Sequence, residues 1–310
     1  KMDFSNYIDE QENYFKNGDT LPISKRKKLL KNLKKEILAN EKEIFDVLKK
    51  DLRKSNYETY LTEIGILITE IDLFLKNIDN WAKPKKVKSS LLSFPSSDYV
   101  YSEPYGKILI ISPWNYPFQL AILPTMSAVA AGNTVVLKPS EHAPHTSKLI
   151  KDIIEKVFEK SHVLVIEGAA ETASKLLEYR WDYIFFTGSV RIGKIVAAAA
   201  AKTLTPITLE LGGKNPCIID DTIDLKLAAR RIVWGKFVNA GQTCIAPDFL
   251  IVKNNIKDKL IGELLSEIKR AYGENPENSE DYPRIVNKTN LSRLSNLIEG
   301  TNIVYGGKYN

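Results

Sequence analysis

Cys244 is one of two cysteines in this 310-residue chain, and it ends the polar, turn-prone stretch Gly241-Gln242-Thr243-Cys244. Such a stretch suits the presentation of a nucleophilic thiol better than its burial. Apolar residues at 232–238 and a predicted strand at 249–252 would place the thiol at a junction between rigid elements, where catalytic groups are often found. A single cysteine is nevertheless more often an inert packed side chain, so the other chemical groups in the sequence must decide its role.

Two further segments carry groups that thiol chemistry would use. Glu210 follows a predicted strand at 207–209 and precedes two glycines, which leave open space around a carboxylate that could act as a general base. Asn115 stands between two prolines, and an amide held in this way could stabilise a developing oxyanion. Each has a structural alternative: Glu210 as a surface residue before a turn, and Asn115 as the cap of a helix that begins near Pro117.

A glycine loop follows another predicted strand and opens a helix. Gly188 and Ser189 begin this loop, and Gly193 lies further along it. The free N–H groups at the start of a helix can hold a phosphate. The segment nearly matches a P-loop, because Lys194 follows Gly193, but Ile195 stands where Mg²⁺ binding needs Ser or Thr. No Gly-x-Gly-x-x-Gly motif occurs in the chain. Plain helix capping remains an alternative to phosphate binding.

Lys138 and Glu141 follow a third predicted strand, and they carry opposite charges three residues apart. An ammonium group can donate to ribose hydroxyls and a carboxylate can accept from them, at the edge of a parallel sheet where nucleotides bind. A surface ion pair is the alternative for this segment when it is read alone.

The predicted elements fall into three regions. Apolar residues at helical spacing predict helices in the first 81 residues, with Ser24 as an N-cap candidate, and residues 85–103 are typical of an extended hairpin arm. Strands and helices alternate after Lys107, which predicts an α/β fold with a parallel sheet covered on both faces. A last strand is predicted at 303–305. The expected helices are 4–15, 24–39, 41–52, 57–81, 117–131, 146–160, 174–179, 190–201 and 225–238.

Composition limits the function classes. The net charge is +6, and much of it comes from residues 25–35, where leucines at helical spacing favour a solvated lysine face over nucleic-acid or anionic-membrane contact. Apolar runs stay below the roughly 18 residues that a membrane span needs. Two distant cysteines provide no disulfide framework or zinc spacing, so a reducing, cytoplasmic location is expected.

These motifs, taken in order, resemble the aldehyde dehydrogenase superfamily, and residues 242–248 look most like its class 3 branch, which prefers medium-chain, fatty and aromatic aldehydes. The resemblance covers about residues 4–310. It is carried by Pro-Trp-Asn-Tyr-Pro (113–117), Lys-Pro-Ser-Glu (138–141), Phe-Thr-Gly-Ser (186–189), Glu-Leu-Gly-Gly-Lys-Asn-Pro (210–216) and Gly-Gln-Thr-Cys (241–244).

The resemblance implies roles for single residues. Cys244 would attack the aldehyde, Asn115 would hold the oxyanion together with the Cys244 N–H, and Glu210 would activate the water that hydrolyses the thioester. Lys138 and Glu141 would bind the adenosine ribose of the cofactor. The other implied cofactor contacts are Trp114, Gly188, Ser189, Gly193 and Gly212.

The resemblance also implies a doubly wound parallel-sheet NAD-binding domain (1–82 and 104–209), an oligomerisation hairpin arm (83–103) and an α/β catalytic domain (210–310) that is incomplete at its C-terminus. NAD is the expected cofactor, because Glu141 would repel a 2′-phosphate, with NADP left open as a second cofactor. No metal is expected. The expected partners are an aldehyde and, for the full-length protein, a second copy of the chain, with no nucleic acid and no membrane segment.

Two alternatives of other classes remain at this stage. One is an inactive fragment or scaffold form of the same enzyme, with intact motifs on an incomplete fold. The other is an NAD-independent cysteine hydrolase or acyltransferase, which would pair Cys244 with a histidine. The three histidines, His142, His145 and His162, are all remote from Cys244 in sequence.

Overall fold

The computed structural model describes residues 3–308. The chain divides into two compact units. The first comprises the residues up to Glu41 together with Thr62–Glu141 and Ser147–Glu210, and the second comprises Lys42–Leu61, His142–Thr146 and the residues from Leu211 onward. Each unit is described by itself below.

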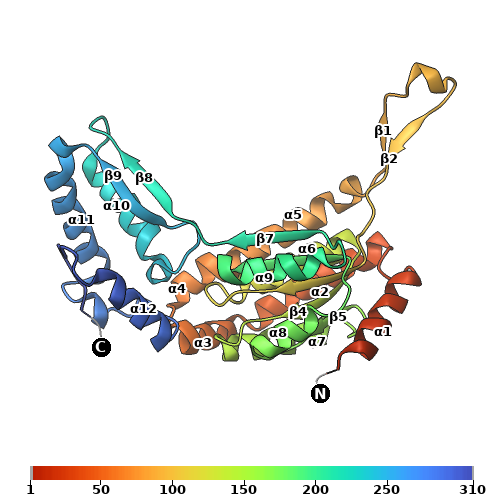
Figure 1. Cartoon of the computed structure of the whole chain (residues 1–310), viewed down its shortest axis with the longest axis horizontal. Helices are drawn as coiled ribbons and strands as arrows, with labels where there is room; N and C mark the ends of the chain where they lie inside the picture. The colour runs from red at the N-terminus through yellow and green to blue at the C-terminus, as the bar shows by residue number, and fades with distance from the viewer. Residues whose placement is uncertain (1–2, 309–310) are drawn as a thin grey trace. The chain divides into compact units, whose positions relative to one another are not determined.

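A five-stranded sheet with the order β5-β4-β3-β6-β7 forms the centre of the first unit (Figure 1). Strand β3 pairs in parallel with both β4 and β6, and β4 pairs in parallel with β5. The chain therefore builds outward from β3 first on one side and then on the other, which is the doubly wound arrangement. The predicted α/β fold with a parallel sheet is confirmed. The strands are β3 (Lys107–Ile111), β4 (Thr134–Lys138), β5 (Val163–Val165), β6 (Tyr183–Gly188) and β7 (Ile207–Leu211).

Helices cover this sheet because its central strands are apolar on both faces. Helices α1 and α6 pack on β3 and β4, and α9 packs on β6. Under these helices, the strand residues Leu109, Val135 and Val136 are each completely buried. The helices are α1 (Ser5–Lys16), α2 (Ile23–Ala39), α5 (Gly65–Trp81), α6 (Gln119–Ala131), α7 (Pro144–Val157), α8 (Ala170–Leu176) and α9 (Val190–Ala201).

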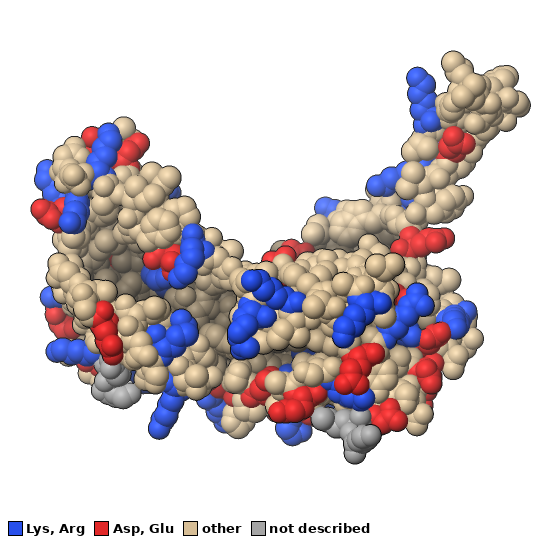
Figure 2. Space-filling model, viewed as in Figure 1, with Lys and Arg blue, Asp and Glu red and all other residues tan. Residues whose placement is uncertain are grey.

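The lysine-rich helix α2 has the two faces that its sequence predicts. Leu30, Leu33 and Ile37 are fully buried. On its wet face Lys27 and Lys34 form ion pairs with Asp79 and Asp72 of α5, each at 2.6 Å. Figure 2 shows basic and acidic residues interspersed over the face that it presents. The lysines thus form the solvated face of the helix.

An antiparallel hairpin follows α5. Strand β1 (Lys85–Val87) pairs with β2 (Asp98–Val100), as the sequence predicts, and a single 3₁₀ turn (Leu91–Ser93) lies between them (Figure 1). Leu91 is 93% exposed and Phe94 is 83% exposed. Side chains of this kind usually find a partner surface. The assignment of the hairpin to oligomerisation remains a prediction.

The second unit is a smaller α/β layer. Strands β8 (Asn215–Ile219) and β9 (Pro247–Val252) pair in parallel, with α10 (Leu225–Phe237) and α11 (Lys257–Tyr272) beside them (Figure 1). Its core contains Ile219, Ala229 and Leu260. The remaining elements are α3 (Glu41–Leu52), α4 (Asn56–Thr59), α12 (Lys288–Ile298), 3₁₀ turns at Asn254–Ile256 and Pro276–Asn278, and a left-handed turn within Val238–Gly241.

Three local predictions differ from the structure. Helix α2 begins at Ile23 after Pro22, so Ser24 lies inside the helix and is not its N-cap. Residues 303–305 form no strand. The helix predicted at 57–81 contains one π-helical turn, Tyr60–Ile64, between α4 and α5. Among the described residues, the helices lack the combination of length and apolar character that crossing a membrane requires.

Candidate active site

Three neighbouring strands of the first unit bring most of the predicted site residues to one edge of the sheet. Ile111 of β3 is in register with Lys138 of β4 and with Phe186 of β6. These strands are parallel, so the segments that carry Asn115 and Ser189 leave the sheet at the same carboxyl edge where Lys138 lies. Nucleotides bind at this edge in doubly wound sheets, at the point where the strand order reverses.

Lys138 is buried and paired. Its Nζ donates to the Oε2 atom of Glu141 at 2.6 Å, and the lysine side chain is 3% exposed while that of Glu141 is 34% exposed. A buried ammonium beside a carboxylate forms a charge-assisted hydrogen bond. The alternative of an exposed surface pair does not fit a lysine that is almost completely covered. The accessible member of the pair is the carboxylate, which can accept from a ligand hydroxyl.

Ser189 caps helix α9. Its hydroxyl accepts from the Ile192 N–H at 3.4 Å, and the Gly193 N–H donates to the Ser189 carbonyl at 2.9 Å. At Gly188 a Cβ atom would lie 2.5 Å from the Phe186 ring, so a larger residue at this strand end would force the ring to move. The helix N-terminus stands at the carboxyl edge of the sheet and is suited to an anion. Capping by Ser189 is compatible with phosphate binding, and the cofactor role of these residues remains a prediction.

The half-buried Asn115 does not cap helix α6. The N–H groups of Phe118 and Gln119 donate to the carboxylate of Glu63, at 3.0 and 2.9 Å. Glu63 is completely buried, and a carboxylate at a helix N-terminus is favoured by the helix dipole. This removes the capping alternative for Asn115. Glu63 was not anticipated, because nothing in its local sequence indicates a partner 55 residues away.

Glu210 is exposed and lies on β7, which runs two residues beyond its predicted end, to Leu211. Gly212 follows, and a Cβ atom there would meet nothing within 4 Å. The predicted open space around the glycines is therefore present at Gly212. The general-base role of Glu210 is not tested by these observations.

Both cysteines are free thiols of the second unit. Cys244 is exposed, and Cys217, on β8, is half-buried. The side-chain amide of Asn215 donates to the Cys244 carbonyl at 2.8 Å and to the Ala246 carbonyl at 3.1 Å. Asn215 belongs to the Glu-Leu-Gly-Gly-Lys-Asn-Pro motif, but its role was not anticipated. It fixes the backbone on the C-terminal side of the thiol.

The turn before Cys244 is left-handed at three successive residues. Asn239, Ala240 and Gly241 have φ angles of 54°, 52° and 76°. For the two non-glycine residues this conformation costs about 1–2 kcal/mol each. Gln242 closes the turn, because its Nε2 atom donates to the Asn239 carbonyl at 3.0 Å.

Gln242 also ties this turn to a distant loop. Its Nε2 atom donates to the Arg284 carbonyl at 3.0 Å, and its Oε1 atom accepts from the Val286 N–H at 2.9 Å. The glutamine of the Gly-Gln-Thr-Cys motif therefore has a structural task. It links the turn before Cys244 to residues more than forty positions later in the chain.

The predicted residues divide between the two units. Gly212 and Cys244 belong to the second unit. The residues of the first unit are Trp114, Asn115, Lys138, Glu141, Gly188, Ser189, Gly193 and Glu210. The convergence of Asn115, Glu210 and Cys244 on one substrate is therefore a prediction. Within residues 3–308, no group of three or more His, Cys, Asp or Glu side chains is arranged to hold a metal ion.

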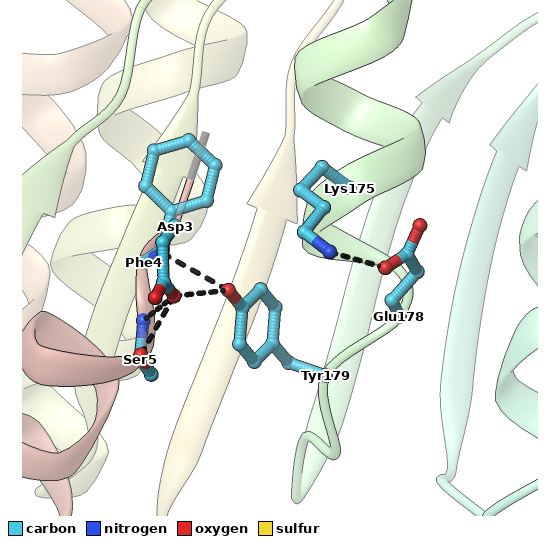
Figure 3. Close-up of polar contacts among 6 residues, drawn as sticks. All are labelled: Asp3, Phe4, Ser5, Lys175, Glu178 and Tyr179. Carbon is cyan, nitrogen blue, oxygen red and sulfur yellow. Dashed lines mark hydrogen bonds and ion pairs between the residues drawn. The ribbon is translucent and has the colours of Figure 1, made fainter. Parts of the chain in front are cut away.

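A separate groove of about 330 Å³ lies on the first unit between α8 and α9, and no predicted site residue lines it. At its edge, the Phe4 N–H donates to the hydroxyl of Tyr179 at 2.9 Å, and this hydroxyl donates to Asp3 at 3.1 Å (Figure 3). Lys175 pairs with Glu178 at 2.5 Å beside them. These contacts fasten the N-terminal segment to the end of α8.

Comparisons with known proteins agree with the motifs. The aldehyde dehydrogenase family model matches residues 1–309. A 4,4′-diaponeurosporen-aldehyde dehydrogenase of Staphylococcus aureus is 46% identical over 296 residues, which cover 95% of this chain and 64% of that protein. A mouse protein named aldehyde dehydrogenase, dimeric NADP-preferring, is 41% identical over 305 residues, which cover 98% of this chain and 67% of that protein.

A solved structure gives the same result for the fold. The substrate-bound state of a Staphylococcus aureus AldH superposes with a TM-score of 0.97 at 43% identity, covering 100% of this chain and 68% of that one. The chain spans less than two thirds of the length of the first relative. The family model extends over almost every residue, and the chain belongs to the aldehyde dehydrogenase family.

Proposed function

We propose that this chain contains the cofactor site and the nucleophile of an NAD(P)-dependent aldehyde dehydrogenase that oxidises an aldehyde to a carboxylic acid. The observation that carries the proposal is the exposed Cys244 thiol on a backbone held by Asn215 and Gln242. A nucleophile needs access to its substrate together with a defined position, and this loop provides both.

The sheet edge of the first unit fits a dinucleotide. The Lys138–Glu141 pair can bind ribose hydroxyls, the α9 N-terminus can face a phosphate, and Gly188 leaves no side chain in the way. NAD would supply the acceptor for the hydride that leaves the substrate. We propose NAD as the preferred cofactor, because the exposed Glu141 carboxylate would repel a 2′-phosphate. The mouse relative named NADP-preferring makes this preference worth measuring.

In the proposed reaction, the Cys244 thiolate adds to the aldehyde carbon to form a C–S bond, and the carbonyl oxygen takes the negative charge. Asn115 and the Cys244 N–H donate to this oxyanion. Loss of hydride from the carbon collapses the adduct to a thioester. Glu210 then takes a proton from water, whose oxygen attacks the thioester, and the thiolate leaves as the carboxylic acid is released.

The experiment is a panel of medium-chain, fatty and aromatic aldehydes assayed with the full-length protein and NAD. Aldehyde-dependent formation of NADH with release of a free acid supports the proposal. Acyl transfer or hydrolysis that proceeds without NAD would instead favour a cysteine hydrolase. A full-length protein that binds NAD but oxidises no aldehyde in the panel would point to the inactive form.

We also propose that the full-length protein is a cytoplasmic homodimer assembled through the β1–β2 hairpin. Two free cysteines are compatible with a reducing compartment. The exposed Leu91, Leu92 and Phe94 support an interface on the hairpin. Replacing Leu91 and Leu92 by Asp should convert a dimer to a monomer in light scattering, and an unchanged mass would contradict this role for the hairpin.

A further inference from the structure

We propose that Glu58 is a positioning residue for Cys244, because its buried carboxylate holds the left-handed turn that leads to the nucleophile. The proposal rests on the role of Cys244 given above. It concerns a residue 186 positions earlier in the chain, in a helix that none of the recognised motifs includes.

The contact that carries the proposal is buried. The Oε1 atom of Glu58 accepts from the Asn239 N–H at 2.9 Å. Glu58 is 7% exposed and Asn239 is completely buried. The position of Glu58 is itself fixed, because its own N–H donates to the Ser55 hydroxyl that caps α4. A carboxylate is costly to remove from water, so a charge kept at this position needs a compensating role.

Asn239 is the first residue of the strained turn. The left-handed conformation continues through Ala240 and Gly241, and Cys244 lies five positions after Asn239. Gln242 and Asn215 hold the middle and the end of this segment. The Glu58 carboxylate holds its beginning, at the N–H of the first left-handed residue, which follows the extended Val238 at the end of α10. A turn in a disfavoured conformation persists only when its surroundings impose it.

An aromatic cluster that includes Phe237, two residues before Asn239, lies near this contact. Phe237 stacks on Tyr272 with 5.6 Å between the ring centroids, and Tyr272 meets Tyr282 at 5.2 Å. Burial, and after it the negative charge of Glu58, raises the pKa of Tyr272 to about 12. The Glu58 carboxylate therefore lies close enough to the cluster to act electrostatically on Tyr272. A hydrogen bond in such surroundings gives more rigidity than one in water.

A purely structural role would be different: Glu58 would then join α4 to the rest of the second unit without influencing the thiol. Three variants separate the two roles: Glu58→Ala, Glu58→Gln and the double variant Glu58→Ala/Ala240→Gly. Glycine adopts the left-handed conformation without strain, so Ala240→Gly compensates only for a lost restraint on the turn. Glu280→Ala, which removes an exposed carboxylate from the same unit, is the matched control.

The test uses the full-length protein and two readouts. Hydrogen exchange of the 239–246 amides is measured without substrate, and kcat and KM are measured with NAD and aldehyde. We expect Glu58→Ala to speed exchange in this segment at least tenfold and to lower kcat about tenfold with the KM for NAD unchanged. Glu58→Gln should lose less, since its amide oxygen can still accept, and Ala240→Gly should restore several-fold of the kcat lost in Glu58→Ala.

The proposal is overturned if Ala240→Gly restores none of the kcat lost in Glu58→Ala. It is also overturned if the 239–246 amides exchange hydrogen equally fast in Glu58→Ala and in Glu280→Ala. If Glu58→Ala does not fold, Glu58→Gln with and without Ala240→Gly provides the same comparison. The exchange readout needs no catalysis. A protein without dehydrogenase activity would therefore contradict the proposed function while the role of Glu58 in the turn is still decided.

Discussion

Asn215 holds Cys244 by its backbone: its side-chain amide donates to the Cys244 carbonyl at 2.8 Å and to the Ala246 carbonyl at 3.1 Å. One side chain thus bridges two carbonyls on either side of the residue that follows the thiol. It comes from the first residue of β8, which pairs in parallel with β9, with a register shift between Asn215 and Pro216. The backbone at Cys244 is in this way attached to a strand and not only to its own loop.

Replacing Asn215 by Ala removes both hydrogen bonds. We expect kcat to fall about tenfold, because the thiol loses its defined position, and the free energy of unfolding to fall by about 1–2 kcal/mol. Steady-state kinetics and urea unfolding measure the two effects. Asn215→Asp is the stricter variant, since a carboxylate of similar shape cannot donate to carbonyls. A kcat that both variants leave unchanged would remove Asn215 from the positioning of Cys244.

The two thiols should differ completely in their effect on turnover. Cys244→Ala should abolish aldehyde-dependent NADH formation, because no other group on the loop can form the thioester. Cys217 packs against the core of the second unit, so Cys217→Ala should leave turnover nearly intact at a stability cost of about 1 kcal/mol. Turnover in Cys244→Ala would show that the proposed nucleophile is wrong.

The exposed carboxylate of Glu141 should set the cofactor preference. Glu141→Gln keeps the shape and removes the charge that would repel a 2′-phosphate, so the kcat/KM ratio of NADP to NAD should rise about tenfold, which corresponds to about 1.4 kcal/mol. Glu178→Gln, at an exposed position in the turn that follows α8, is the control and should leave the ratio unchanged. A wild-type protein that already prefers NADP would contradict the proposed role of Glu141.

His162 should make the stability of the first unit sensitive to mild acid. Burial, followed by repulsion from Lys25, lowers its pKa from 6.5 to about 4. Its ring contacts Tyr14 of α1 and Phe158, with centroids 5.3 and 5.7 Å away. The native state therefore keeps the imidazole neutral at a pH where the unfolded chain is already protonated.

The sign follows from proton uptake. Between pH 6.5 and 4 the unfolded state binds a proton that the native state does not. As the pH is lowered from 6.5 to 4, the free energy of unfolding therefore decreases by up to about 3 kcal/mol. Below pH 4 this contribution is constant. Denaturant unfolding of wild type and of His162→Phe at several pH values measures it. Equal slopes for the two proteins between pH 6.5 and 4 would contradict the assignment.

Local patterns were sufficient for most of the fold. The apolar spacing of α2 predicts which residues are buried, and the continuous apolar strands predict a parallel sheet covered on both faces, since these features repeat within a few residues. The start of α2 was misjudged because Pro22 begins a helix as well as a serine cap does. The strand predicted at 303–305 has the residue types of a strand, but no neighbouring strand pairs with it in the described chain.

The sequence alone determined the identity and order of the chemical groups: the thiol of Cys244, the carboxylates of Glu141 and Glu210, the Lys138 ammonium and the Asn115 amide. Only the tertiary structure decided what holds them. Glu63 caps α6 from 55 residues away, and Glu58 reaches the turn at Asn239 across 181 residues. Short motifs record the chemistry of the reacting atoms, but a buried hydrogen bond depends on which distant segments the core brings together, and no local pattern encodes that choice.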